Sequence, residues 1–197
     1  TKLPQVLLME NVPQVISRAN ISDFQKWQYK LEQLGYSNYV QLLNAKDYGI
    51  PQNRNRCFMV SILGDFYYGF PRKQKLKLRL KDMLEDEVNE KYCNTEPKVA
   101  QTICLNSKVN GKQPRVQDRV YDSKGISTAI TTSFMPSVST KSLRIRKLTP
   151  KECWRLMGFA DEDFYKASKV NNNAQLYKQA GNSIVVNVLE AIFKELL

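Results

Sequence analysis

Apolar runs of strand length alternate with one helical pattern in the first third of the chain. Residues 6–9, 39–43 and 57–63 are apolar, β-branched or aromatic, as in buried strands. Residues 21–34 place apolar side chains at helical spacing, and Ser22 is predicted as the N-cap, with a glutamine three residues later. The order strand, helix, strand, strand predicts one end of a mostly parallel sheet in an α/β fold.

The periodicity breaks down between residue 64 and about residue 142. Residues 72–81 hold six basic side chains, and leucines alternate with lysine and arginine. This pattern predicts a solvated edge strand or loop, with phosphate contact as the alternative. Residues 119–121 and 126–132 resemble short strands around a turn. The segment is therefore predicted to be a small, loop-rich, mostly β lobe.

Helical patterns return near the end of the chain. Pro150 is predicted to open a helix, with Thr149 as its cap, and Gly158 to end it. Residues 184–197 form a second helical pattern with one apolar face.

Together these patterns predict three parts. Residues 1–63 and 146–197 would build one α/β domain, and residues 64–145 would build the separate lobe.

Charge and composition narrow the class of protein. The 197 residues carry 30 Lys and Arg against 19 Asp and Glu, a formal charge of +11, which favours a polyanionic partner. No apolar run approaches the roughly 20 residues of a membrane helix. The four cysteines form no Cys-x-x-Cys pair and histidine is absent, so we expect no metal site, reduced thiols and a cytoplasmic location. Cys57 and Cys153 are expected to be buried.

Glu10 follows the first apolar run, at the position where α/β enzymes place ligand-binding groups. A carboxyl group there is commonly an ion-pair partner or a cap. In its protonated form it can also bind both N3 and the amino group of a cytosine flipped out of the duplex. Partial burial would favour that form, whereas a nearby arginine would favour the charged form.

Two further groups of polar residues suit the same chemistry. Gln52-x-Arg54-x-Arg56 places two guanidinium groups on one face of an extended segment, where they suit a pyrimidine O2, a phosphate or the Glu10 carboxylate; surface arginines are the alternative. Asn182 or Ser183 is predicted as the N-cap of the last helix. Free backbone N–H groups at such a helix start could bind a carboxylate, such as that of S-adenosylmethionine.

These segments, in this order, resemble the cytosine-C5 DNA methyltransferases. Residues 8–12 look like the family's Glu-Asn-Val motif, residues 48–56 like its Gln-x-Arg-x-Arg motif, residues 146–159 like its ninth motif, and residues 177–186 like its Gly-Asn-Ser element. The irregular stretch between the second and third lies where the family has its target-recognition domain. The resemblance implies the carboxy-terminal part of a Rossmann-like methyltransferase sheet with a target-recognition lobe.

The resemblance also implies a reaction and a set of roles. A cysteine thiolate adds to C6 of a flipped cytosine, and C5 then takes the methyl group of S-adenosylmethionine. Glu10 would hold N3 and the amino group, Arg56 the O2 side, and Arg54 would brace the site or a phosphate. The implied cofactor contacts are Asn182 and Ser183, and the implied contacts to cytosine or DNA are Asn11, Gln52, Arg119 and Thr131.

Two elements of the family are absent from this sequence. No Pro-Cys occurs, since the residues before the cysteines are Arg56, Tyr92, Ile103 and Glu152, and no two glycines are spaced as in the Gly-x-Gly cofactor loop. Both elements belong to the amino-terminal half of such enzymes. We therefore expect a fragment or split subunit of a bacterial or phage enzyme, inactive alone and prone to self-association unless its partner half covers it.

Two other functions fit parts of the pattern. A DNA-binding module without catalysis would explain the charge alone. An RNA cytosine methyltransferase is disfavoured because that branch carries Cys-Phe-Thr between the second and third motifs; Cys57-Phe58 is followed by Met59 and lies too early.

Overall fold

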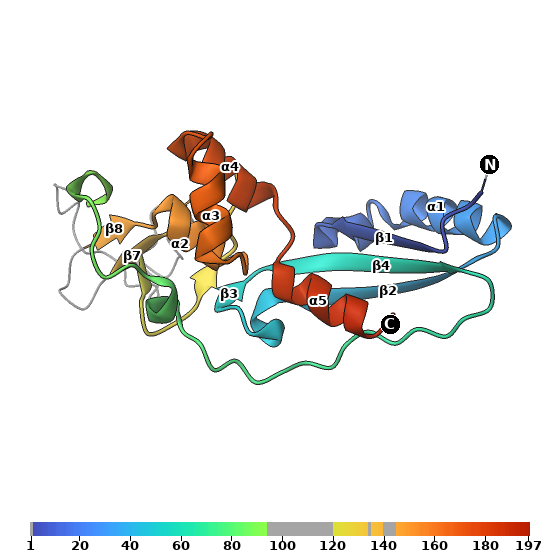
Figure 1. The fold of residues 1–197 in the computed structure, drawn as a ribbon. Coiled ribbons are helices and arrows are strands. Elements are labelled where there is room, and N and C mark those ends of the chain that lie inside the picture. Colours follow the sequence, from blue (N-terminus) through green and yellow to red (C-terminus); the bar gives the residue numbers. More distant parts are fainter. Residues whose placement is uncertain (1, 94–119, 134, 140–144) are drawn as a thin grey trace.

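A computed structural model describes residues 2–93, 120–133, 135–139 and 145–197. A three-stranded sheet lies at one end of the molecule, and short strands and three helices lie at the other (Figure 1). The sheet has the order β1-β4-β2 and comprises β1 (Val6–Asn11), β2 (Tyr36–Asn44) and β4 (Asn55–Leu63).

Both pairings in this sheet are antiparallel, so the expectation of mostly parallel neighbours is wrong for these three strands. The β2–β4 connection is short, and a short connection returns the chain antiparallel to the strand it leaves. β1 and β2 run in the same direction, but β4 separates them. β1 is a partly exposed edge strand within the described chain, not the buried strand expected from its composition.

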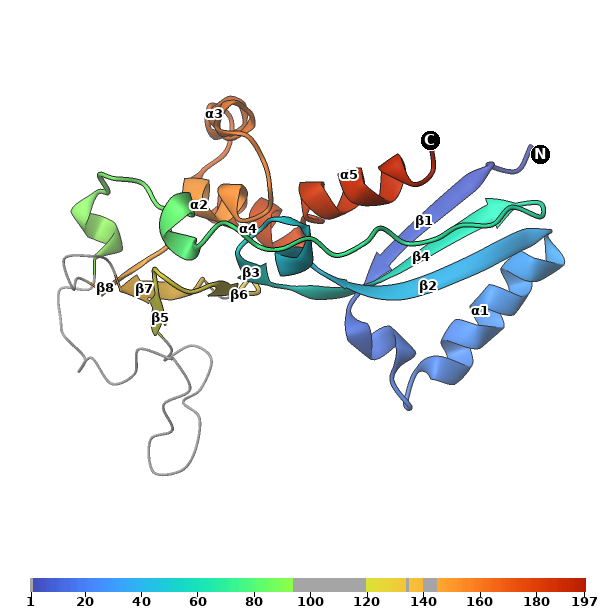
Figure 2. The same ribbon diagram turned by 90° about the horizontal axis from the view of Figure 1, so that it is seen from below.

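One face of the sheet is covered by α1 (Ile21–Gln33) (Figure 2). Phe24 and Leu31 are buried there against Met59 of β4. The helix begins after Asn20, and Ser22 lies inside it, so the predicted N-cap is wrong.

The opposite face is covered by α5 (Val186–Lys194) (Figure 2). Val188 and Ile192 pack in the same cluster as Phe58 and Val60. Successive side chains of a strand point to opposite faces, so β4 supplies both cores. This explains why its apolar run is nearly continuous instead of alternating.

After β4 the chain runs in extended form beneath the sheet toward the other end of the molecule (Figure 1). We call residues 72–81 the basic strap. Four short 3-10 helices are described: η1 (Pro13–Ile16), η2 (Ala45–Tyr48), η3 (Leu80–Met83) and η4 (Glu90–Tyr92). The short strands are β3 (Gln52–Asn53), β5 (Val120–Asp122), β6 (Ser127–Thr128), β7 (Ser137–Ser139) and β8 (Ile145–Lys147).

Three helices pack beside these strands: α2 (Pro150–Arg155), α3 (Asp161–Ser168) and α4 (Asn173–Asn182). The predicted start of α2 is confirmed, because Thr149 Oγ1 accepts from the Glu152 N–H and the Glu152 carboxylate accepts from the Thr149 N–H. The same carboxylate is fully buried and forms two hydrogen bonds with Arg146, at 2.6 and 2.8 Å.

One apolar core runs through all three predicted parts of the chain. Leu43, Leu80, Ile130 and Leu156 belong to a single cluster of buried residues. The packing between the three parts is continuous, so their division at residues 63 and 145 stays a prediction from the sequence. No helix in the described ranges is long and apolar enough to cross a membrane.

The closest backbone approach in this core involves Gly181 of α4. A Cβ built on Gly181 would lie 2.5 Å from Thr131 C and 2.5 Å from Thr132 N, well inside van der Waals contact. Glycine is thus required where α4 meets the segment after β6.

We expect Gly181→Ala to lower the free energy of unfolding by about 3 kcal/mol, because the clash is with backbone that must move as a unit. Urea denaturation monitored by circular dichroism measures this. Gly69→Ala is the matched control, since the nearest atoms to its Cβ are 3.9 Å away. An equal, small effect of both substitutions would contradict the inferred close packing.

Candidate functional site

Glu10, Arg54 and Arg56 come together beneath the start of α5. They line a narrow hollow of about 10 Å³, which has room for about one water molecule. Phe58 and Val185 are among the apolar residues of its wall. Glu10 lies near the end of β1, opposite Phe58 of β4. The structure thus brings together the first two predicted groups of polar residues.

Arg56 forms an ion pair with Glu10, at 2.9 Å between Nε and Oε1. Both side chains are about one-fifth exposed, at 18% and 19%, so the pair lies at the mouth of the hollow. No hydrogen bond from a described residue reaches Glu10 Oε2. The ion pair therefore orients the carboxyl group and leaves one oxygen available.

Arg54 is buried, with 4% of its surface exposed, and its guanidinium binds backbone carbonyls. Nη1 donates to Ile130 O at 2.6 Å, and Nη2 donates to Gly181 O and Ser183 O at 3.1 and 2.9 Å. Burial lowers the pKa of Arg54 to about 10; Arg56 adds to this effect and Glu10 opposes it. The group stays charged at neutral pH.

Gln52 is fully buried, and the protein itself uses both ends of its amide. Nε2 donates to Leu156 O at 2.7 Å, and Oε1 accepts from Ile130 N at 3.1 Å. Gln52 and Arg54 thus hold the N–H and the carbonyl of the same residue, Ile130. We call this arrangement the Gln52–Arg54 clamp. The clamp uses the amide of Gln52 for hydrogen bonds within the protein, so this amide is not available for a contact with DNA.

The predicted geometry of the third polar group is wrong. Asn182 ends α4, Ser183 caps its C-terminus, and the residue before α5 is Val185, whose side chain forms no capping bond. The groups that this segment presents to Arg54 are carbonyls, and carbonyls do not bind a carboxylate. Asn182 is exposed, and Ser183 Oγ donates to Gln179 O at 2.6 Å.

The remaining predicted DNA contacts are not among the residues that line the hollow, or they fall outside the described residues. Asn11 is exposed, and its Oδ1 accepts from Val12 N at 2.8 Å. Thr131 is exposed, and its Oγ1 lies 3.5 Å from Ser133 Oγ. Arg119 falls outside the described residues.

The buried cysteines do not suit nucleophilic chemistry. Cys57 and Cys153 are fully buried, as expected. Burial raises the pKa of the Cys57 thiol, with a smaller contribution from Glu10, and raises that of Cys153 well above its usual value, with a smaller contribution from Glu152. Since a thiolate is the reactive form, neither side chain is a candidate nucleophile at neutral pH. The described residues contain no cluster that could hold a metal ion.

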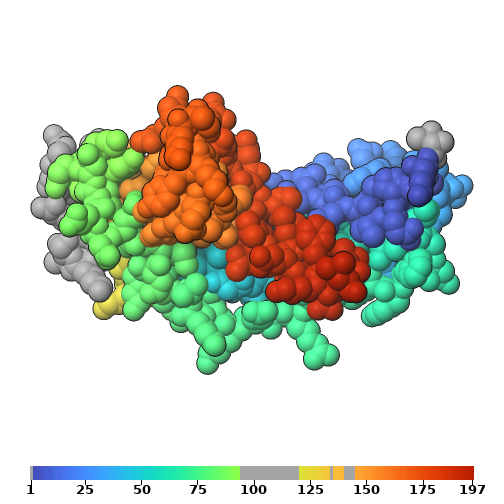
Figure 3. Space-filling model, in the orientation of Figure 1, coloured from blue at the N-terminus to red at the C-terminus, as the bar shows by residue number. Residues whose placement is uncertain are grey.

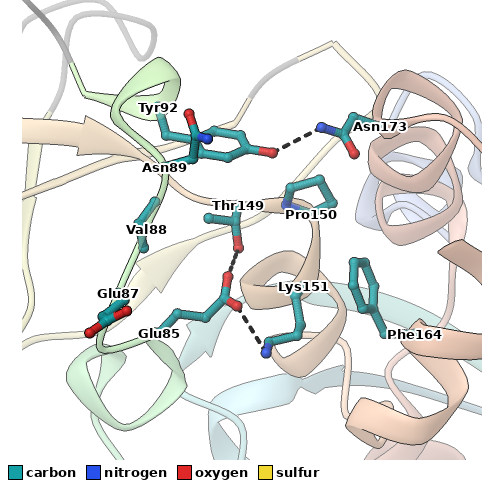
Figure 4. Close-up of a pocket in the computed structure, with 10 residues that line it drawn as sticks. All are labelled: Glu85, Glu87, Val88, Asn89, Tyr92, Thr149, Pro150, Lys151, Phe164 and Asn173. Carbon is teal, nitrogen blue, oxygen red and sulfur yellow. Dashed lines mark hydrogen bonds and ion pairs between the residues drawn. The ribbon is translucent and has the colours of Figure 1, made fainter.

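A larger pocket, of about 220 Å³, lies between residues 85–92 and the start of α2 (Figure 4). Its polar groups bind one another: Lys151 pairs with Glu85 at 2.9 Å, Thr149 donates to Glu85 at 2.6 Å, and Asn173 donates to Tyr92 at 2.9 Å. These contacts tie residues 85–92 to α2 and α4, and we assign the pocket this structural role.

Sequence reasoning missed the partners of the clamp. The acceptors on Ile130, Gly181 and Ser183 are backbone carbonyls, which any residue type supplies, so composition carries no signal for them. The one available signal was Gly181, because glycine destabilises a helix and its presence there suggests a packing constraint.

We expect Arg54→Ala to lower the free energy of unfolding by about 3 to 5 kcal/mol, because three carbonyls lose a charged donor. Arg54→Lys should recover only part of this, since one ammonium cannot reproduce the planar fork. Chemical denaturation tests both variants. Equal stability of Arg54→Lys and the wild type would show that the fork geometry is unimportant.

Alkylation provides a second test. At neutral pH, iodoacetamide should leave Cys57 and Cys153 unmodified in the folded chain and should modify both in urea, as peptide mass spectrometry would show. Rapid modification of either residue in the folded chain would contradict its burial.

Comparison with known proteins identifies related sequences. The C-5 cytosine-specific DNA methylase family matches residues 1–197. The chain is 42% identical to the Type II methyltransferase M2.ScrFI of Lactococcus lactis subsp. cremoris, covering 99% of this chain and 55% of that protein. It is 37% identical to the Type II methyltransferase M.Bsp6I of Bacillus sp. (strain RFL6), covering 100% of this chain and 67% of that protein. The chain thus spans about half to two thirds of the length of these relatives.

Solved structures show the same fold. The S. pombe Dnmt2 methyltransferase matches with a TM-score of 0.76 and 21% identity, over 100% of this chain and 68% of that one. The Entamoeba histolytica methyltransferase EhMeth matches with a TM-score of 0.71 and 18% identity, over 98% of this chain and 64% of that one. The match of the family along the whole sequence, together with these relatives, shows that the chain belongs to the C-5 cytosine-specific DNA methylase family.

Proposed function

We propose that this chain is the carboxy-terminal, base-binding and target-recognition portion of an S-adenosylmethionine-dependent DNA (cytosine-5)-methyltransferase. The observation that carries the proposal is the Glu10–Arg56 pair at the mouth of the hollow, which Arg54 also lines. The pair places a carboxyl group beside a guanidinium, and together these groups match the hydrogen-bond donors and acceptors along one edge of cytosine.

The base would meet this pair edge-on. The hollow is too small for a pyrimidine, so the base edge would rest at its mouth, where both side chains are partly exposed. In its protonated form Glu10 would donate to N3 and accept from the amino group, and Arg56 would donate to O2. In a duplex these atoms are paired with guanine, so the cytosine would have to be flipped out.

Arg54 would act as a positioning residue. Its guanidinium is held by three carbonyls, so it fixes β4 relative to residue 130 and to the α4–α5 connection. A site that must hold a base within a fraction of an ångström needs such support. Gln52 would contribute through the same clamp, and not through contact with DNA.

The residues proposed for the cofactor fit it in part. The exposed Asn182 side chain forms no hydrogen bond with a described residue, so it is free to bind a polar group of S-adenosylmethionine. The Ser183 hydroxyl would first have to leave Gln179 O. The bound cofactor would supply the methyl group; this chain's own residues would bind and orient the base.

The nucleophile would come from a Pro-Cys-Gln segment in an amino-terminal half, linked or separate. Two cysteines of this chain are buried thiols with raised pKa values, and none of the four follows a proline. The activity is therefore proposed for the combination of both halves, acting on double-stranded DNA in the cytoplasm of a bacterial or phage-infected cell.

We expect tritiated methyl transfer to mixed-sequence DNA only when this chain is mixed with such an amino-terminal half. In that mixture Glu10→Gln should lower kcat/KM about 100-fold or more, since the orienting carboxyl group is lost. Glu190→Gln, on the exposed surface of α5, is the matched control and should leave the rate unchanged. Methyl transfer by this chain alone, lost on Glu10→Gln, would overturn the proposed division of roles.

A second function, a DNA-binding module without catalysis, is favoured by the net charge of +11 alone. Salt-dependent DNA binding with no methyl transfer in any mixture would support it.

A further inference from the structure

The basic strap has a concentration of charge that the base-binding site does not use. Residues 72–81 contain six basic and no acidic side chains. Lys73 pairs with Asp47 at 3.3 Å, whereas Arg72, Lys75 and Lys77 form no ion pair with a described residue. Its positive charge is thus mostly uncompensated by the protein.

The strap is fixed at both ends before any ligand binds. Gln74 N donates to Asp47 O at 2.8 Å near η2, and Tyr48 Oη donates to Pro71 O at 3.0 Å. At the other end Leu80 is fully buried and its N–H donates to Gly125 O at 2.9 Å. An ordered backbone loses little entropy when its side chains bind, so the strap suits a preformed binding surface.

The exposed side chains of the strap point away from the core. Arg72, Lys75 and Lys77 are exposed, and the strap projects along the lower edge of the molecule in the space-filling view (Figure 3). Alternate residues of an extended segment lie about 6.6 Å apart on one side. Lys75 and Lys77 therefore form part of a linear row of cations.

The acidic run that follows the strap, Glu85-Asp86-Glu87, does not neutralise this row. Glu85 faces the pocket on the other side of η3, where Lys151 and Thr149 bind its carboxylate. Asp82 accepts from the Arg79 N–H at 2.7 Å, which closes the start of η3. The two charged segments are thus separated by the buried residues of η3.

We infer that the basic strap binds the phosphate backbone of duplex DNA flanking the methylated site. The strap connects η2, which packs against α5 near the hollow, to the turn at residues 123–125 of the proposed recognition lobe. A linear, solvent-exposed and preordered row of cations is complementary to a phosphate backbone, and phosphate contacts position a protein without reading sequence. The inference rests on the proposed action on DNA and adds a contact surface to it.

The test is the salt dependence of DNA binding. Fluorescence anisotropy would follow binding of the full chain to two duplexes of unrelated sequence, from about 50 to 200 mM salt. The variant is Arg72→Gln/Lys75→Gln/Lys77→Gln. The slope of log K against log salt should fall in magnitude by about two to three, because each lost phosphate contact removes about 0.9. Affinity at low salt should fall about tenfold or more for both duplexes.

A control with the same loss of charge is Lys169→Gln/Lys178→Gln/Lys194→Gln, three exposed lysines on or next to helices away from the strap. This control variant should keep most of the wild-type slope of log K against log salt. Thermal unfolding should show that both variants remain folded.

An unchanged slope in the strap variant, or equal losses in both variants, would overturn the inference and leave the proposed function intact. No salt-dependent binding by the wild type would also overturn it. The proposed function is decided separately, by methyl transfer in the two-half mixture.

Discussion

The structure depends on one residue, Ile130, whose backbone N–H and carbonyl are held by two buried side chains, Gln52 of β3 and Arg54 just after it. Gln52 accepts from its N–H and Arg54 donates to its carbonyl. A buried guanidinium needs hydrogen-bond acceptors around it, and Arg54 finds two further carbonyls, on Gly181 and Ser183. The clamp thereby sets the distance between the sheet, the short strands and the last two helices.

The clamp also divides the two arginines by role. Arg54 and Arg56 are two residues apart and line the same hollow, but one is enclosed by carbonyls and the other meets Glu10 at the surface. The Gln-x-Arg-x-Arg segment of this chain therefore combines an arginine buried among carbonyls with one that is partly exposed and paired with Glu10. A second positive charge nearby is one reason why the pKa of Arg54 is lowered, after burial.

The sequence predicted those parts of the fold whose signal is local. The three strands of the sheet, α1 and the Thr149 cap were predicted from apolar spacing and cap residues, although Ser22 was misplaced as a cap. Strand direction could not be predicted, because β4 is apolar on both faces whether its neighbours are parallel or antiparallel.

The break between α4 and α5 was also misplaced. Gly181, Asn182 and Ser183 have low helix propensity, which indicated a helix start there, whereas α4 continues through Asn182. The carbonyls near this point bond to Arg54, a tertiary contact that carries no local signal. At the site, the grouping of Glu10 with the arginines was predicted, whereas the clamp on Ile130 was not.

Because both ends of the basic strap are fixed, the strap can differ in length without changing the structure on either side of it. Asp47 holds one end and Ser123 with Gly125 the other, while residues 75–79 between them make no backbone hydrogen bond to either the sheet or the short strands. Extra residues inserted in that interval would bulge into solvent without moving either attachment. The strap is thus a place where relatives could gain or lose residues, and with them surface charge, while the clamp and the base-binding pair stay in register.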